Sequence, residues 1–502
     1  MNPANSHVSQ QELEQYLWGA ATLLRGGVDP GEYKNIIFSL MFFKRISDVY
    51  DEELEETLKE SDGDLEYAQF AENHRFIVPD GSHWKDVREI TTDVGKAIQD
   101  AMREIEKANP DKLEGIFGDG NWTNKDRLSD KTLIDLLEHF SSLKLTIKNV
   151  PQDQFGNAYE YLIKKFADDS GHTAAEFYTN RTVVELMALI MNPKSGESIY
   201  DPTCGSGGML LNSLLLVKKR GEEYRNIKLY GQEINLITSA IARMNMFIHD
   251  VGDFHITRGD TLENPAFIKN DRVQQFDMVI ANPPYSIKKW NQSGWTKDPW
   301  GRNIYGTPPQ GCADYAFFQH IICSMKEDTG RCGILYPHGV LERDSEQKMR
   351  AKIIEDDLVD CVIGLGENLF YNAAMESCLV FCKMNKEPHK KGKILFIDAK
   401  EDVTREKTQS FLEPDHIEKI HNAYVNYKDV DGFAKVVDIT KIRENEYNLN
   451  ISLYFDNNLY IDNELLETPI ETYIENWKES SHHLKCSIAE LESILKEIIK
   501  NE

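Results

Sequence analysis

The sequence lacks the features that mark secreted, membrane-spanning or metal-binding proteins. Its eight cysteines form no Cys-x-x-Cys pair and show no metal-ligand spacing with histidine, so we expect reduced thiols, most of them in the core. No basic segment followed by an apolar one opens the sequence, and no apolar run approaches the length of a membrane span. These absences predict a soluble, cytoplasmic protein that makes no contact with a membrane.

Positive charge is scarce as well. The 502 residues include 57 Lys+Arg against 83 Asp+Glu, which gives a formal net charge of −26. A protein that grips nucleic acid by itself usually presents a basic face. If this chain acts on nucleic acid, we therefore expect a partner to supply much of the binding surface, beside any local basic patch.

The patterns that are present divide the chain into three expected regions, since 502 residues exceed one ordinary core. Residues 1–150 carry apolar residues at helical spacing after a capping box at Ser9–Glu12, which predicts a helical domain. Residues 151–400 alternate near-continuous apolar strands with helical stretches from about residue 183, which predicts an α/β domain with a mostly parallel sheet. Residues 401–502 turn helical and charged again. The expected strands are 198–200, 228–230, 255–257, 277–280, 332–335, 359–363 and 378–381.

A glycine-rich turn follows the first expected strand and reads Asp201-Pro-Thr-Cys-Gly205-Ser206-Gly207-Gly208. Glycines permit a tight strand-to-helix turn and let a ligand approach bare backbone amides at a helix N-terminus. The spacing fits neither a phosphate loop nor a dinucleotide fingerprint. Taken alone, the turn is therefore as consistent with a structural role as with ligand binding.

Carboxylates stand at the ends of the next two expected strands, Glu233 after the second and Asp260 after the third. The carboxyl ends of parallel strands meet at one edge of a sheet, and a carboxylate one βαβ unit past a glycine turn can accept hydrogen bonds from two ribose hydroxyls. Each acid taken singly is more often a surface residue or a cap. Together with the glycine turn, the two acids predict a nucleoside ligand.

The fourth expected strand ends in Asn282-Pro283-Pro284-Tyr285. The prolines stiffen the backbone and leave carbonyl groups free of strand pairing. The Asn282 side-chain oxygen and the Pro283 carbonyl can both accept hydrogens from one exocyclic amino group, and the Tyr285 ring offers a surface on which a planar base can stack. Such a site suits methyl transfer to an aromatic amine and needs neither a metal nor a covalent nucleophile.

In number and order, these features resemble class I S-adenosylmethionine-dependent amino-methyltransferases of DNA, and more narrowly the modification subunit of Type I restriction–modification systems. The resemblance implies a Rossmann-like, mostly parallel seven-stranded sheet with an N-terminal helical domain and a C-terminal helical tail. It also implies transfer of a methyl group from S-adenosylmethionine to N6 of an adenine that is flipped out of duplex DNA. The motifs that carry the resemblance are Leu17–Gly26, Glu32–Lys34, Phe43–Asp48, Gly156–Leu162, Glu176–Arg181, Leu229–Glu233 and Tyr447–Ile451.

Matched motif by motif, the resemblance assigns a role to each candidate site residue. The catalytic residues, which hold the target adenine, would be Asn282, Pro283, Pro284 and Tyr285. The cofactor-binding residues would be Glu176, Phe177, Tyr178, Thr179, Asn180 and Arg181 over the methionine part, Asp201, Gly205, Ser206, Gly207 and Gly208 in the glycine turn, Glu233 on the ribose and Asp260 on the adenine. Asn180 stands where the family usually has proline, from which we expect only a local change in loop stiffness, and Tyr285 is phenylalanine in many relatives.

The resemblance also implies partners. DNA would be read by a separate specificity subunit that binds two copies of this chain, and a motor-nuclease restriction subunit would join for cleavage. The terminal heptad pattern from Leu484 to Ile498 is a candidate docking helix for the specificity subunit, although packing on its own domain is equally consistent with it. The N-terminal helical domain would close around DNA.

Three alternatives stay open on the residues alone. A protein glutamine methyltransferase can also use an Asn-Pro-Pro-Tyr loop, and an RNA adenine methyltransferase uses the same chemistry. A non-catalytic assembly subunit with an inactive cofactor site is the alternative from another class. Incorporation of labelled methyl groups into DNA, RNA or protein separates the enzymes, and cofactor binding separates them from the assembly subunit.

Overall fold

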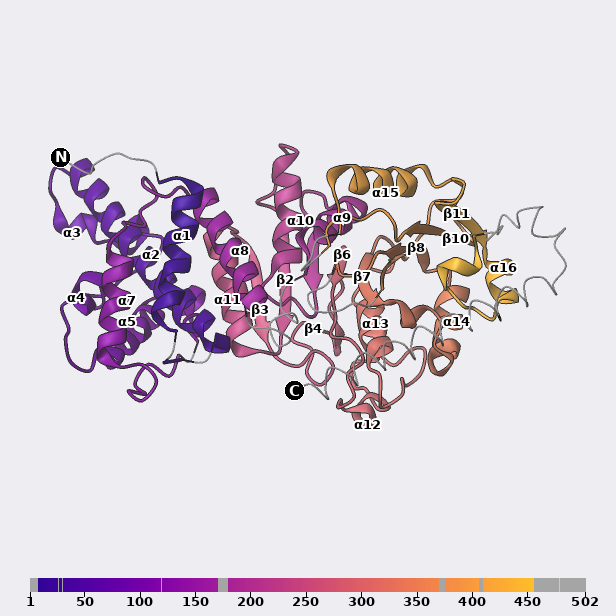
Figure 1. Ribbon diagram of the computed structural model, residues 1–502, viewed down its shortest axis with the longest axis horizontal. Helices are drawn as coiled ribbons and strands as arrows, with labels where there is room; N and C mark the ends of the chain where they lie inside the picture. Colours follow the sequence, from indigo (N-terminus) through magenta and orange to yellow (C-terminus); the bar gives the residue numbers. More distant parts are fainter. Residues whose placement is uncertain are drawn as a thin grey trace, which may run out of the picture. The chain divides into compact units, whose positions relative to one another are not determined.

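The computed structural model describes residues 8–455, apart from residues 26, 29, 119, 170–178, 370–375 and 406–409, together with residue 478. These residues form a helical region followed by a sheet region (Figure 1). The predicted terminal heptad and the candidate site residues Glu176, Phe177 and Tyr178 lie outside the described residues. Among the residues described, no helix is both long and apolar enough to cross a lipid bilayer.

Among the described residues, eight α-helices and a short 3-10 helix form the helical region. They are α1 (Gln10–Leu23), α2 (Pro30–Glu60), α3 (Leu65–Ala68), η1 (Ala71–Asn73), α4 (Trp84–Arg88), α5 (Val94–Ala108), α6 (Pro110–Leu113), α7 (Asp130–Ser141) and α8 (Gln152–Asp169). The predicted capping box is confirmed, because the Ser9 amide donates to the Glu12 carboxylate at 2.9 Å and the Glu12 amide donates to Ser9 Oγ at 3.3 Å.

One apolar core joins these helices to the sheet region. It includes Tyr159 of α8 and also Ile241 and Met244 of α11 (Leu236–Ile248), a helix that packs on the sheet. The Tyr159 hydroxyl donates to the carbonyl oxygen of Ile241 at 2.9 Å. Helix α8 is therefore fixed between the two regions, within reach of the sheet edge.

The sheet has nine strands in the order β11-β10-β8-β9-β7-β6-β1-β2-β3. Strands β3, β2, β1, β6 and β7 are parallel to one another, β9 is antiparallel to both of its neighbours, and β10 is parallel to β8. The strands are β1 (Ser198–Asp201), β2 (Lys228–Glu233), β3 (Phe254–Arg258), β6 (Met278–Ala281), β7 (Arg331–Pro337), β8 (Val359–Leu365), β9 (Ser377–Lys383), β10 (Lys393–Ala399) and β11 (Ala434–Asp438), beside a separate hairpin of β4 (Ile268–Lys269) and β5 (Arg272–Val273). The predicted α/β fold and all seven predicted strands are confirmed.

Two strands extend the sheet beyond the seven expected. Strand β10 lies parallel to β8, and β11 then pairs antiparallel with β10 over Lys393–Ile397 and covers that edge. Residues of α15 (Pro414–Asn426) and β11 also join the apolar core of the sheet region. Residues 401–455 therefore complete the sheet, whereas the sequence predicted a helical region from residue 401. The pairing partner of β11 is set by tertiary contact rather than by local pattern.

Helices cover both faces of the sheet. Ile199 of β1 belongs to the apolar core that includes Leu210 of α10 and Ile420 of α15. The next side chain, Tyr200, points to the opposite face, where its hydroxyl lies 3.0 Å from Nε2 of His320 in α13. Burial on both faces explains why the strands read as continuous apolar runs. The helices of this region are α9 (Arg181–Met191), α10 (Gly208–Lys219), α11, α12 (Gln292–Trp295), α13 (Asp314–Cys323), η4 (His338–Leu341), η5 (Asp344–Glu346), α14 (Gln347–Glu355), α15, α16 (Ile439–Glu444) and η6 (Ile451–Leu453).

The cysteines of the described residues are free thiols, and six of these seven are buried. Four of them lie in the strands β7, β8 and β9 of the sheet, where they act as small apolar side chains. This arrangement agrees with the expected reduced cysteines of the core.

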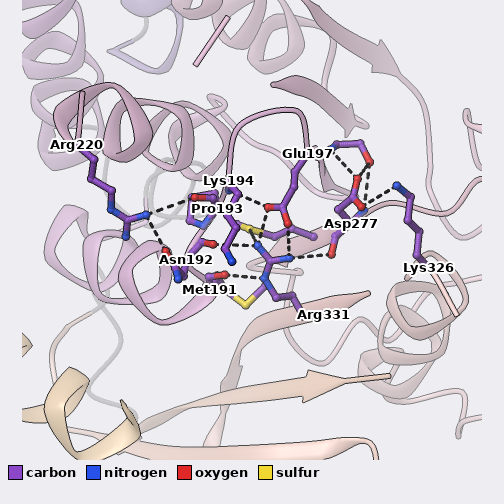
Figure 2. Close-up of polar contacts among 11 residues, drawn as sticks. Met191, Asn192, Pro193, Lys194, Glu197, Arg220, Asp277, Lys326 and Arg331 are labelled. Atoms are coloured by element: carbon purple, nitrogen blue, oxygen red, sulfur yellow. Dashed lines mark hydrogen bonds and ion pairs between the residues drawn. The ribbon is translucent and has the colours of Figure 1, made fainter. Parts of the chain in front are cut away.

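An ion-pair network closes the amino edge of the sheet (Figure 2). Arg331, the first residue of β7, donates to both carboxylate oxygens of Glu197 at 3.0 and 2.7 Å and to the Met191 carbonyl at 2.6 Å. Asp277 accepts the Ser198 amide hydrogen at 2.9 Å at the start of β1. The network thus ties the starts of β1, β6 and β7 to the end of α9, and leaves the carboxyl edge free to carry the site.

Replacing Arg331 with methionine should lower the free energy of unfolding by about 3 kcal/mol, because the Glu197 carboxylate loses its cation in a partly buried place. The two side chains are 16% and 19% exposed. The control is Arg220→Met, which removes an exposed guanidinium that donates to Asn192 Oδ1 at 2.7 Å and should cost less than about 1 kcal/mol. Urea unfolding of both variants makes the comparison, and equal losses would contradict the assigned role of Arg331.

Candidate active site

The glycine turn is a tight strand-to-helix connection between β1 and α10. Gly205 and Gly207 adopt positive φ angles of 53° and 78°. A Cβ atom on Gly207 would lie 2.6 Å from the Met246 methyl group, so the turn packs closely on α11, while the positive φ is what favours glycine there. Helix α10 begins at Gly208, and its first amides point out of the turn without an intrahelical acceptor. The turn therefore offers backbone donors to a ligand.

Two buried carboxylates flank the glycine turn. Asp201 at the end of β1 accepts the Thr203 amide hydrogen at 2.9 Å. Glu233 at the end of β2 accepts the amide hydrogens of Gly205 at 3.1 Å and Asn235 at 2.8 Å. Burial, together with the negative charge of Glu233, raises the pKa of Asp201 to about 8. Two acids that share a site in this way hold one proton near neutral pH, and the remaining lone pairs of their oxygens suit ligand hydroxyl or amino groups.

Two hydroxyl groups hold the side-chain amide of Asn282, in the loop after β6, one at its nitrogen and the other at its oxygen. Its Nδ2 donates to Thr179 Oγ1 at 3.0 Å, and its Oδ1 accepts the Tyr285 hydroxyl hydrogen at 2.7 Å. The plane of the amide is thereby held between two hydroxyl groups, with the oxygen on the Tyr285 side. Pro283 is buried and Pro284 is exposed. Burial raises the pKa of Tyr285 well above its ordinary value, so its hydroxyl stays a donor at neutral pH.

A buried network beneath this loop was not found from the sequence. The amide of Ser286, which has a φ of 51°, donates to Asp314 Oδ1 at 2.8 Å. The other oxygen of Asp314 pairs with the Arg343 guanidinium at 2.6 Å, and Arg343 also pairs with Glu346 at 3.4 Å and contacts Cys312 Sγ. Cys312, Asp314 and Glu346 lie close enough together to ligate a metal ion. Because the guanidinium occupies that space, we interpret the network as an anchor for the loop.

One pocket brings the glycine turn and the Asn282 loop together. Asn282 faces Gly205 and Ser206 across it, and helix α8 contributes Glu160 and Ile163 to its wall. The described residues that line the pocket are Glu160, Ile163, Thr179, Arg181, Val184, Asp201, Thr203, Cys204, Gly205, Ser206, Gly208, Met209, Asn212, Asn245 and Asn282. The structure therefore brings together side chains that are more than 100 residues apart in the sequence.

Some expected site residues are used differently. Asn180 caps α9: its Oδ1 accepts the Thr182 amide hydrogen at 3.0 Å and its Nδ2 donates to the Ser410 carbonyl at 2.9 Å. Its side chain thus caps the helix and does not line the pocket. Asp260 Oδ1 accepts the Leu262 amide hydrogen at 2.9 Å and shapes the turn after β3. Both residues are outside the described pocket lining, so their predicted contacts with a ligand stay predictions.

Sequence reasoning did not place eight of the lining residues in the site, and these include the polar side chains of Glu160 and Asn245. Glu160 lies in the Gly156–Leu162 motif. That motif supports the resemblance to the family, but no role in the site was assigned to its residues. Asn245 donates from Nδ2 to the Ser206 carbonyl at 3.1 Å, and its only signal is a polar residue in the apolar pattern of α11. The arrangement as a whole can hold a nucleoside-type ligand beside an amide acceptor and an aromatic ring.

Comparison with known proteins relates this geometry to a family. Residues 150–462 match the family model described as N-6 DNA Methylase, and residues 13–140 match the model described as the HsdM N-terminal domain. The Type I restriction enzyme MjaVIII methylase subunit of Methanocaldococcus jannaschii is 34% identical over 89% of this chain and 78% of its own length. The MpnII methylase subunit of Mycoplasma pneumoniae is 28% identical over 95% of this chain and 96% of its own length.

A solved structure agrees with these sequences. The methyltransferase subunit of a Type I restriction–modification system from Streptococcus thermophilus superposes with a TM-score of 0.77 at 31% identity. The alignment covers 89% of this chain and the whole of that one. The similarity therefore includes both the helical region and the sheet region.

The buried Asp201 gives a pH prediction that does not depend on any ligand. Between about pH 4 and pH 8 the folded chain keeps a proton on this carboxyl that the unfolded chain releases, so the free energy of unfolding falls as pH rises through this window, by up to about 1.4 kcal/mol per pH unit. Asp201→Asn removes the titration, and its free energy of unfolding should fall less steeply. Urea unfolding of both proteins at several pH values measures the slopes, and identical slopes would contradict the raised pKa.

Proposed function

The chain belongs to the N-6 DNA methylase family and is an adenine-specific DNA methyltransferase, the modification subunit of a Type I restriction–modification system; from that premise we propose that its reaction takes place in the pocket between the glycine turn and Asn282. S-adenosylmethionine would be the methyl donor and N6 of a flipped adenine the acceptor. The observation that carries the proposal is that a single pocket is lined both by the turn that suits a nucleoside and by the amide that suits an amino group.

The residues of the pocket fit the proposed cofactor. Thr203 Oγ1 and Asn245 Oδ1 are buried without a hydrogen-bond partner among the described residues, and both residues line the pocket. Buried polar atoms are normally satisfied, so these two are expected to bond a ligand or a water molecule. Asp201, Glu233 and the amides at the start of α10 add acceptors and donors for the nucleoside. When bound, the cofactor supplies an electrophilic methyl group on a sulfonium.

The loop after β6 would hold the adenine. Asn282 Oδ1 and the Pro283 carbonyl would accept the two hydrogens of the N6 amino group and orient the nitrogen toward the methyl group. Stacking on the Tyr285 ring would help offset the few kcal/mol that flipping costs. The hydroxyl of Tyr285 adds a second function, because its hydrogen bond at 2.7 Å fixes the Asn282 oxygen in the accepting position. Asp314 would support this geometry from below through the Ser286 amide.

The partners of this chain are a further part of the proposal. A net charge of −26 gives the chain little general attraction for phosphate. We propose that a specificity subunit reads the DNA and binds two copies of this chain, and that a restriction subunit joins them for cleavage. In this assembly residues 1–150 close around DNA, residues 151–400 catalyse, and residues 401–502 dock the specificity subunit.

Asn282→Ala should separate binding from chemistry. We expect the affinity for S-adenosylmethionine to stay within about threefold, because Asn282 is assigned to the base, while the rate of DNA methylation falls about 100-fold or more from the loss of an acceptor worth about 3 kcal/mol. Calorimetry and transfer of tritiated methyl groups measure the two quantities. An unchanged methylation rate would contradict the assignment of Asn282.

Substitutions at Tyr285 test its two functions separately. Tyr285→Phe keeps the ring and removes the hydrogen bond to Asn282, so methylation should fall by about tenfold or less. Tyr285→Ala also removes the stacking surface, and a further loss of about 1–3 kcal/mol is expected. Equal activity of the two variants would show that the ring does not stack on the adenine. Fluorescence of 2-aminopurine at the target position reports flipping in the same samples.

A further inference from the structure

The Tyr447–Ile451 motif follows α16 and lies outside the described lining of the pocket. The side chains of Leu449 and Ile451 are 4% and 0% exposed, and η6, which Ile451 begins, contacts β8 and β10. Glu446 and Tyr447 adopt φ angles of 54° and 57°, a left-handed backbone that is unfavourable for residues other than glycine. Such a conformation persists where the surrounding contacts hold it, so the motif is fixed at a defined place on the sheet region.

The motif contacts the segment that connects β7 to α14. The amide of Leu449 donates to the Leu341 carbonyl at 2.9 Å. Asn450 Nδ2 donates to Glu342 Oε2 at 2.7 Å. Both acceptors lie directly before Arg343 in the sequence, so the motif meets the chain beside the arginine of the buried network.

Arg350 of α14 connects the motif to the same arginine a second time. Its side chain belongs to a residue that is 2% exposed. Arg350 Nε donates to the Tyr447 carbonyl at 2.7 Å, and Nη1 donates to the Arg343 carbonyl at 3.2 Å. A buried guanidinium is costly unless its N–H groups are hydrogen-bonded, so these contacts hold the two backbones at a set separation.

From Arg343 the contacts continue to residues 282–286, which we call the target-base loop. The Arg343 guanidinium pairs with Asp314 at 2.6 Å, and the other oxygen of Asp314 accepts the Ser286 amide hydrogen at 2.8 Å. Ser286 has a left-handed backbone and directly follows Tyr285. The place of the Tyr285 ring, and of the Asn282 oxygen that it contacts, therefore depends on where Arg343 is held.

We propose that Arg350 and the Tyr447–Ile451 motif position the target-base loop by holding Arg343 beneath it. The assignment rests on the proposed function and goes beyond it, because it gives a part in methyl transfer to residues that follow the predicted catalytic region. Arg350 and the motif lie outside the described pocket lining. They are positioning residues that act on the adenine through the loop and leave cofactor binding unaffected.

Two variants test the assignment in the complex with the proposed specificity subunit. Arg350→Met removes the buried guanidinium, and Asn450→Ala removes one contact at the surface, which the fold tolerates more easily. We expect the kcat of adenine methylation to fall about tenfold in Arg350→Met and about threefold in Asn450→Ala, as for the loss of hydrogen bonds that hold the loop. The fluorescence of 2-aminopurine at the target position should fall in parallel.

The affinity for S-adenosylhomocysteine separates positioning of the loop from general stability of the fold. It should stay within about twofold in both variants, which also shows that they are folded. Arg350→Lys keeps a cationic donor for the two carbonyls and should recover part of the lost kcat. The matched control is Tyr447→Phe, which removes only the hydroxyl bond to Glu355 at 2.9 Å and should leave kcat unchanged.

Unchanged methylation in Arg350→Met and Asn450→Ala, or equal losses of methylation and cofactor affinity, would overturn the positioning role and leave the proposed function standing. Should Arg350→Met bind no S-adenosylhomocysteine, Asn450→Ala decides alone by the same criteria. Absence of adenine methylation by the unaltered complex would overturn the proposed function and the positioning role together.

Discussion

The side-chain amide of Asn282 is held between Thr179 and Tyr285, and the chemistry of the pocket depends on that restraint. A free amide at the end of a strand would rotate and present either its oxygen or its nitrogen to a base. The hydrogen bonds at 3.0 and 2.7 Å hold the plane of the amide, with its oxygen on the Tyr285 side, where it is proposed to accept from an amino group. Thr179 also lines the pocket, so one threonine contacts both Asn282 and the proposed cofactor site.

The sheet determines where Asn282 lies relative to the other residues of the pocket. Parallel strands place the glycine turn, Glu233 and the Asn282 loop at one edge, where ligands of open α/β sheets bind. The ion-pair network around Arg331 closes the opposite edge. Helix α8 extends the pocket from outside the sheet through Glu160.

Local sequence pattern predicted much of this arrangement, and its failures have physical causes. Strand ends marked by Gly205, Glu233 and Asn282 were found because each carries a residue type that a strand interior rarely needs. Strand β11 was missed because its pairing with β10 is a tertiary contact. Asn180, which the resemblance places over the cofactor, caps α9 in the structure, and the residue type alone does not distinguish a helix cap from a ligand-binding residue. The pair of Asp314 and Arg343 is separated by a helix and a strand, and nothing in the local pattern joins them.

The identity of the methylated atom is the most direct test of the central claim. The chain, co-expressed with the proposed specificity subunit, would be incubated with duplex DNA and isotopically labelled S-adenosylmethionine, and the DNA would be digested to nucleosides for mass spectrometry. The account predicts labelled N6-methyldeoxyadenosine as the product. Label on N4 of cytosine, or label found on protein glutamine with none in DNA, would contradict it.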